Sequence, residues 1–150
     1  MNKNAEKVMF QVGINAIEIW LQRKGWQLDL DYCNKDEMFS DTKQVFISSR
    51  QSVENQLYSL LHECGHVLVQ QNKPSYEKNY PVVSKASKSP KNFKQIEKTK
   101  KYKLDVITEE IEAWRRGKSL ANRLDIHINE RKYNELAADC VHSYMEWATK

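Results

Sequence analysis

Two histidines four residues apart, with a glutamate between them, restrict the structure of this chain more than any other feature. The pentapeptide 62–66 reads His-Glu-Cys-Gly-His. An α-helix advances 3.6 residues per turn, so His62 and His66 point in the same direction if the segment is helical. The two imidazoles can then bind one metal ion, and Glu63 stands beside that ion. The spacing therefore predicts a helix that contributes to a metal site.

The residues around this pentapeptide favour the same helix. Apolar side chains recur at three- and four-residue intervals and form one stripe: Leu57, Leu60, Leu61, Cys64 and Leu68. Ser52 is a suitable N-cap, and Asn72 and the residues after it favour an end. We predict a helix over about 51–71. Gly65 destabilises a helix by about 1 kcal/mol relative to alanine, and a close approach by another element would explain its presence.

The length and composition are those of an ordinary globular domain. The chain has 150 residues, of which 40% are hydrophobic and 29% are charged, and we expect a single domain over 1–150. No apolar run reaches membrane-spanning length and the polar start is no signal peptide, so we expect a cytoplasmic protein. Cys33, Cys64 and Cys140 are widely spaced and form no C-x-x-C pair. We interpret them as reduced core residues, neither a disulfide framework nor a cysteine-rich zinc site.

The order of the remaining elements predicts an α+β fold. The alternating residues 26–32 and the apolar run 44–48 predict two strands, separated by a polar turn over 34–41. Helical periodicity precedes and follows these strands, with Asn129 as the cap of a final helix. The predicted helices outside the histidine segment span 4–24, 104–124 and 129–147. Helices packed on a small sheet are the expected arrangement.

Lysine dominates the segment that follows the histidine helix. Between Lys85 and Lys103 there are eight lysines and one acidic residue, Glu97. Such a segment buries little apolar surface, so we predict a long, basic, mobile loop over 73–103. One interpretation of residues 85–103 is a contact for nucleic acid or an acidic partner, and the other is a solvated insertion between helices.

A third metal ligand is expected, because a catalytic zinc site ordinarily has three protein ligands and one open position. His127 and His142 have no partner at ligand spacing. The acidic cluster 109–112 offers Glu109, Glu110 and Glu112. Helical periodicity places Glu110 on the apolar face of its helix, where a buried carboxylate needs a partner. We therefore predict Glu110 as the third ligand, ahead of Glu109 and Glu112, while a basic side chain could instead pair with Glu110.

The motif H-E-x-x-H on a helix is typical of zinc-dependent hydrolases. The ion lowers the pKa of its bound water and polarises a carbonyl group, and Glu63 would act as the general base. A donor for the oxyanion is also needed, and Tyr76, Tyr80 and Tyr144 are candidates by residue type alone. A site of nitrogen and oxygen ligands would also accept manganese or another divalent ion.

Two segments resemble a known group of proteins. The strand and histidine helix within 43–72, and the sequence Glu-Glu-Ile-Glu-Ala-Trp-Arg-Arg-Gly within 104–125, resemble the small gluzincin-like metallopeptidases of phage and bacterial genomes, including ImmA/IrrE-type proteins. The resemblance implies a minimal zincin-like core that binds Zn²⁺ through His62, His66 and a cluster glutamate. It also implies intracellular hydrolysis of a protein or peptide substrate.

The chain departs from that pattern in its long lysine-rich link and in having no helix-turn-helix. The alternative hypothesis is a non-catalytic binding module with a zincin fold, which contacts nucleic acid or an acidic protein through residues 85–103. Glu63 distinguishes the two, because hydrolysis requires this carboxylate whereas a binding module tolerates its loss.

Overall fold

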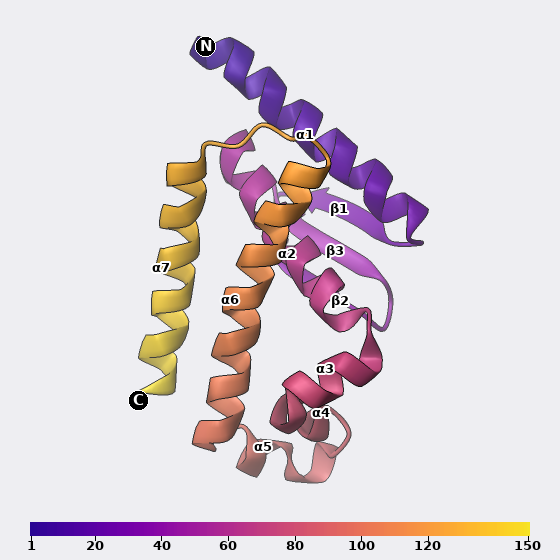
Figure 1. Cartoon of the computed structure of the whole chain (residues 1–150), viewed down its shortest axis with the longest axis vertical. Coiled ribbons are helices and arrows are strands. Elements are labelled where there is room, and N and C mark those ends of the chain that lie inside the picture. Colours follow the sequence, from indigo (N-terminus) through magenta and orange to yellow (C-terminus); the bar gives the residue numbers. More distant parts are fainter.

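The computed structural model describes all residues, 1–150, and has an α+β fold (Figure 1). Two long helices, α2 and α6, lie side by side at its centre, with α1 and the small sheet against one side of α2 and α7 alongside α6. The elements in chain order are α1 (Lys3–Arg23), β1 (Gln27–Asp31), β2 (Glu37–Phe39), β3 (Gln44–Ser48), α2 (Val53–Gln70), α3 (Lys73–Asn79), α4 (Pro81–Ser87), a 3₁₀ turn (Pro90–Asn92), α5 (Phe93–Ile96), α6 (Lys100–Arg123) and α7 (Glu130–Ala148).

The sheet has three strands in the order β1–β3–β2. β1 runs parallel to β3, whereas β2 is antiparallel to it. In the central strand β3, Val45 and Ile47 are buried and their neighbours are half-buried, which is the alternation expected of a strand with one face on the core. The sequence predicted β1 and β3, but β2 lies inside the predicted polar turn. Its three residues have no recognisable pattern, and pairing with β3 creates the strand.

α2 and α6 approach each other closely enough for their backbones to touch. A Cβ atom on Gly65 would overlap the carbonyl oxygen of Ala113, and one on Gly117 would lie 2.5 Å from the carbonyl oxygen of Leu61. Each helix therefore has a glycine where the other presents a backbone carbonyl. The explanation predicted for Gly65 is confirmed. This contact aligns the histidines of α2 with the glutamates of α6.

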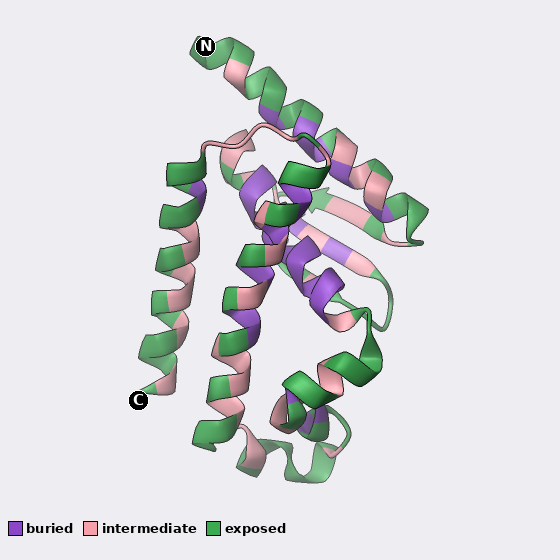
Figure 2. Ribbon diagram, viewed as in Figure 1, coloured by how far each residue is buried: buried purple, intermediate pink, exposed green.

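Burial is concentrated along the facing sides of α2 and α6, as Figure 2 shows. By contrast, α7 is half-buried or exposed along most of its length, and its one fully buried side chain is Tyr133 near its start. The Tyr133 hydroxyl donates a hydrogen bond of 2.5 Å to the carbonyl oxygen of Trp114. Asn129 caps α7 by accepting a hydrogen bond from the backbone N–H of Lys132, as predicted. The beginning of α7 is therefore anchored more firmly than its end.

The structure corrects the predicted loop over 73–103, because this segment contains α3, α4, a 3₁₀ turn and α5. The Asp105 carboxylate of α6 accepts hydrogen bonds from the backbone N–H groups of Val82 and Val83, which lie in the first turn of α4. Ala86 is buried on the inner side of the same helix. Both the cap from Asp105 and the burial of α4 against α6 depend on residues that are distant in the sequence. The lysine-rich composition of the segment therefore gave no indication of these helices. The mobility of the segment stays a prediction.

Candidate metal centre

The imidazoles of His62 and His66 lie on one side of α2 and are both buried. Their Nε2 atoms are 3.2 Å apart. The Trp114 side chain of α6 stacks on the His62 ring, with centroids 4.2 Å apart and an angle of 6° between the planes. This contact restricts the orientation of the His62 ring, so the helix spacing and the tryptophan together hold the two nitrogen atoms close to each other.

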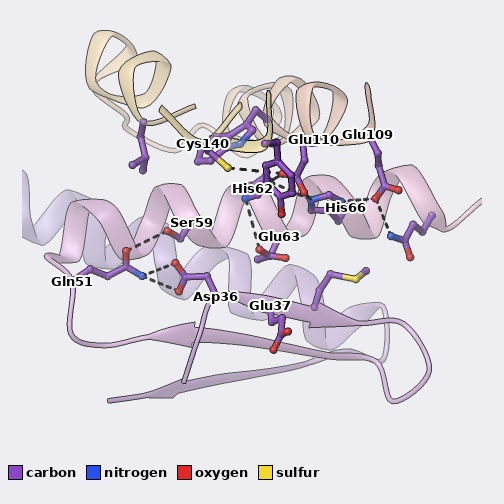
Figure 3. Close-up of a pocket in the computed structure, with 15 residues that line it drawn as sticks. Asp36, Glu37, Gln51, Ser59, His62, Glu63, His66, Glu109, Glu110 and Cys140 are labelled. Atoms are coloured by element: carbon purple, nitrogen blue, oxygen red, sulfur yellow. Dashed lines mark hydrogen bonds and ion pairs between the residues drawn. The ribbon is translucent and has the colours of Figure 1, made fainter. Parts of the chain in front are cut away.

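Glu110 of α6 meets both imidazoles (Figure 3). Its Oε2 atom is 2.8 Å from His62 Nε2, and its Oε1 atom is 3.2 Å from His66 Nε2. Two nitrogen ligands on a tetrahedral zinc ion, each about 2.0–2.1 Å from it, are roughly 3.3 Å apart. The observed separations of 3.2, 2.8 and 3.2 Å are close to that value. The three side chains therefore fit a shared ion in both chemistry and spacing.

Glu109 lies behind His66 and has three hydrogen-bond partners. Its Oε2 atom is 2.5 Å from His66 Nδ1 and accepts a hydrogen bond of 2.9 Å from the Gln70 amide. Its Oε1 atom accepts a hydrogen bond of 2.5 Å from the Tyr76 hydroxyl. A carboxylate at Nδ1 fixes the tautomer that leaves Nε2 free for a metal ion.

Glu112, the third acidic candidate, has a different environment. Its carboxylate accepts hydrogen bonds from Arg115 and Arg116 and lies away from the two histidines. Of the three glutamates, Glu110 contacts the imidazole Nε2 atoms, Glu109 contacts His66 at Nδ1, and Glu112 contacts arginines; the choice of Glu110 as the third ligand stays a prediction.

Glu63 is buried beside His62, with its Oε1 atom 3.7 Å from His62 Nδ1. In Figure 3 its carboxylate lies on the side of Asp36 and Glu37. No side chain donates a hydrogen bond to it, and burial raises its pKa to about 7. A carboxylate with a pKa near neutrality can both accept and release a proton at physiological pH.

The other charged groups of the site form a coupled cluster. Burial lowers the pKa of His62. For His66 burial also acts to lower the pKa, but hydrogen bonds with Glu109 and Glu110 outweigh it and raise the pKa to about 10. Burial acts to raise the pKa of Glu110, and the hydrogen bonds with both histidines lower it to about 2. At neutral pH this carboxylate is therefore ionised, as a metal ligand must be.

All of these groups open onto one cavity of about 520 Å³. The sheet side contributes Asp36, Glu37 and Met38, and α7 contributes Leu136, Cys140 and Tyr144. The Asp36 carboxylate is occupied by hydrogen bonds from the Gln51 amide and the backbone N–H of Ser48. The cavity thus lies between the edge strand β2 and helix α7, with the histidines at its base.

Of the three tyrosines considered from the sequence, Tyr144 alone lines this cavity. The Tyr76 hydroxyl is engaged by Glu109, and Tyr80 is buried against Tyr76. The remaining histidines lie elsewhere. His127 stacks on Phe10, and His142 lies on the exposed side of α7, 3.4 Å from Glu146.

The prediction that the cysteines are core residues is confirmed for Cys64 and is wrong for Cys33 and Cys140. Cys64 is in the core and Cys33 is exposed, whereas Cys140 is half-buried and lines the cavity. Its sulfur is 4.0 Å from Glu110 Oε2. Burial raises the pKa of the Cys140 thiol, and the neighbouring Trp114 indole N–H acts against that rise. The sequence contained no local signal for Cys140, because it is far from the pentapeptide along the chain.

Comparison with known proteins identifies one part of the chain. Residues 17–90 match the family model Peptidase_M78, described as the IrrE N-terminal-like domain. This segment belongs to that family. The predicted resemblance to ImmA/IrrE-type proteins is confirmed, and membership indicates a metal-dependent peptidase or a related protein, with a peptide or protein as the class of substrate. Neither the curated proteins nor the solved structures gave a match.

The matched segment contains His62, Glu63 and His66, and it ends before α6. The family model therefore does not cover Glu109, Glu110 and Glu112 of α6 or Cys140 of α7, whose positions come from the structure. It also gives no support to a nucleic-acid or acidic partner for residues 85–103. No helix of the structure is long and apolar enough to cross a membrane.

Proposed function

We propose that this protein hydrolyses peptide bonds with a Zn²⁺ ion held by His62, His66 and Glu110. The two Nε2 atoms lie 3.2 Å apart, and each lies 2.8 or 3.2 Å from one Glu110 carboxylate oxygen; this convergence supports the proposal most strongly. Two neutral imidazoles and one carboxylate form a typical catalytic zinc set, which keeps a position open for substrate or water.

Glu109 acts as a positioning residue in this proposal. Its carboxylate accepts the Nδ1–H of His66, so that the proton on Nε2 is the one a metal ion displaces when it binds. Hydrogen bonds from Gln70 and Tyr76 hold the Glu109 carboxylate in turn. The Trp114 ring restrains His62 in a comparable way from the other side.

The ion, when bound, polarises the scissile carbonyl and makes water more acidic. Glu63 accepts a proton from the attacking water and delivers it to the leaving nitrogen, for which a pKa near neutrality is suited. Tyr144 faces the same cavity from α7, and its hydroxyl is the donor that we assign to the developing oxyanion.

Metal content tests the ligand assignment. Wild-type protein should bind one zinc ion per chain, and Glu110→Gln should lose it. Glu112→Gln is the matched control, because it removes an acidic group from the same helix whose carboxylate contacts arginines instead of histidines. Retention of zinc by Glu110→Gln together with its loss from Glu112→Gln would refute the assignment.

Cleavage tests the chemistry separately. We expect the zinc-loaded protein to cut an unfolded protein substrate, with the new termini identified by mass spectrometry. Glu63→Gln should keep zinc and lose this cleavage. If Glu63→Gln cleaved as fast as wild type, the general-base role would be wrong, and if neither protein cleaved any substrate, the binding-module hypothesis would replace the proposal.

A further inference from the structure

Cys140 brings a second kind of metal-binding atom to the site from a third helix. Its sulfur is 4.0 Å from Glu110 Oε2, and the donor atoms of His62, Glu110 and Cys140 all lie within 4.8 Å of one another. A sulfur ligand about 2.3 Å from zinc and an oxygen or nitrogen ligand about 2.0 Å from it are roughly 3.5 Å apart in a tetrahedral site. To enter the ligand shell, the sulfur would have to approach Glu110 Oε2 by about 0.5 Å, and His62, whose ring nitrogen lies within 4.8 Å, by up to about 1.3 Å.

A second observation points to a ligand at the same place. The Nε1–H group of Trp114 is fully buried beside the Cys140 sulfur and has no acceptor at full hydrogen-bond geometry. Buried donors are nearly always satisfied, so one without a partner requires an explanation. Trp114 and Cys140 line the same cavity, and a metal-bound thiolate is an anionic acceptor next to this indole.

We propose that Cys140 is a fourth, displaceable zinc ligand that closes the site. This inference rests on the proposed function, because it uses the same ion and the ligands His62, His66 and Glu110. Cys140 loses its thiol proton to solvent and its sulfur occupies the position that water takes in the open site. Zinc then has four protein ligands, which is the arrangement of structural sites and leaves no place for water.

The attachment of α7 makes such a ligand displaceable. The helix is anchored near its start by the buried Tyr133, whereas Cys140 lies further along and is half-buried. Beyond Cys140, Met145 and Trp147 are exposed. A small movement of this second half of α7 separates the sulfur from the ion without disturbing the helix anchor, so substrate entry can compete with Cys140.

X-ray absorption at the zinc edge of the full-length zinc-loaded protein tests the proposal, because sulfur at about 2.3 Å is distinguished from nitrogen and oxygen at about 2.0 Å. We expect one sulfur per zinc in wild type, its complete loss in Cys140→Ser, and its retention in the matched control Cys33→Ser, whose thiol is exposed. With cobalt in place of zinc, the thiolate-to-metal charge-transfer band should be lost in the same variant alone.

Each other outcome has a defined meaning. Zinc bound by nitrogen and oxygen alone in wild type would overturn the role of Cys140 and leave the proposed function standing. A sulfur signal that persists in Cys140→Ser would overturn it as well. A wild-type protein that binds no zinc would overturn both proposals.

Discussion

Replacing Glu63 by its neutral isostere glutamine should stabilise the metal-free protein, and the size of the effect follows from the burial of the Glu63 carboxyl group. Burial raises the pKa of this carboxyl from 4.5 to about 7. Above pH 7 the folded state contains a buried carboxylate without a hydrogen-bond donor, whereas the unfolded state has a solvated one. The difference in pKa corresponds to about 3 kcal/mol of lost stability.

The pH dependence has a definite sign. A group with a raised folded-state pKa contributes its stability fully below the unfolded value of 4.5 and loses it as the pH rises through about 7. Glu63→Gln cannot ionise and avoids this loss. The free energy of unfolding of Glu63→Gln should therefore exceed that of wild type by less than about 1 kcal/mol at pH 5 and by about 3 kcal/mol at pH 8. For a chain of this length that is roughly 6–12 °C in melting temperature.

Urea unfolding followed by circular dichroism, in the presence of a chelator, measures the difference at both pH values. Glu135→Gln is the control, because Glu135 is an exposed acid paired with Arg131, and its replacement should change stability by no more than about 0.5 kcal/mol. Adding zinc should reduce the difference in unfolding free energy between variant and wild type at pH 8, because a nearby cation stabilises the Glu63 carboxylate. A stability difference that does not vary with pH, or a variant less stable than wild type at pH 8, would refute the claim that the buried Glu63 carboxylate destabilises the protein.

Three further predictions concern neighbouring residues. Gly65→Ala should destabilise the protein by at least about 3 kcal/mol in urea unfolding, because the new methyl group meets a backbone carbonyl of α6, whereas Gly13→Ala meets movable side chains and should stay within about 1 kcal/mol of wild type. Equal effects of the two changes would contradict this explanation. Glu109→Gln should weaken zinc binding by about 10- to 100-fold in a chelator competition, and an unchanged affinity would remove its positioning role. Tyr144→Phe should lower kcat roughly 100-fold with the zinc content unchanged, while equal kcat values would exclude its hydroxyl as the oxyanion donor.

Much of the fold could be predicted because its signals are local. The apolar stripe of α2, the Ser52 cap at its start and the alternation in β3 are properties of neighbouring residues. The strand β2 and the helices within 73–103 could not be predicted in this way. Each depends on a partner elsewhere in the chain, β3 for the former and Asp105 of α6 for part of the latter.

The sequence by itself determined the histidine pair and Glu63, since one helical turn brings His62 and His66 together, and it indicated Glu110 through its place on the buried stripe of α6. Only the tertiary structure decided what faces them. Gly65 and Gly117 let α2 and α6 pack backbone to backbone, and this contact brings Glu110 to the Nε2 atoms and Glu109 to His66 Nδ1. The packing of α7 places Cys140 beside Glu110. Side chains from separate helices meet at distances set by packing, and neither periodicity nor motif spacing contains that information.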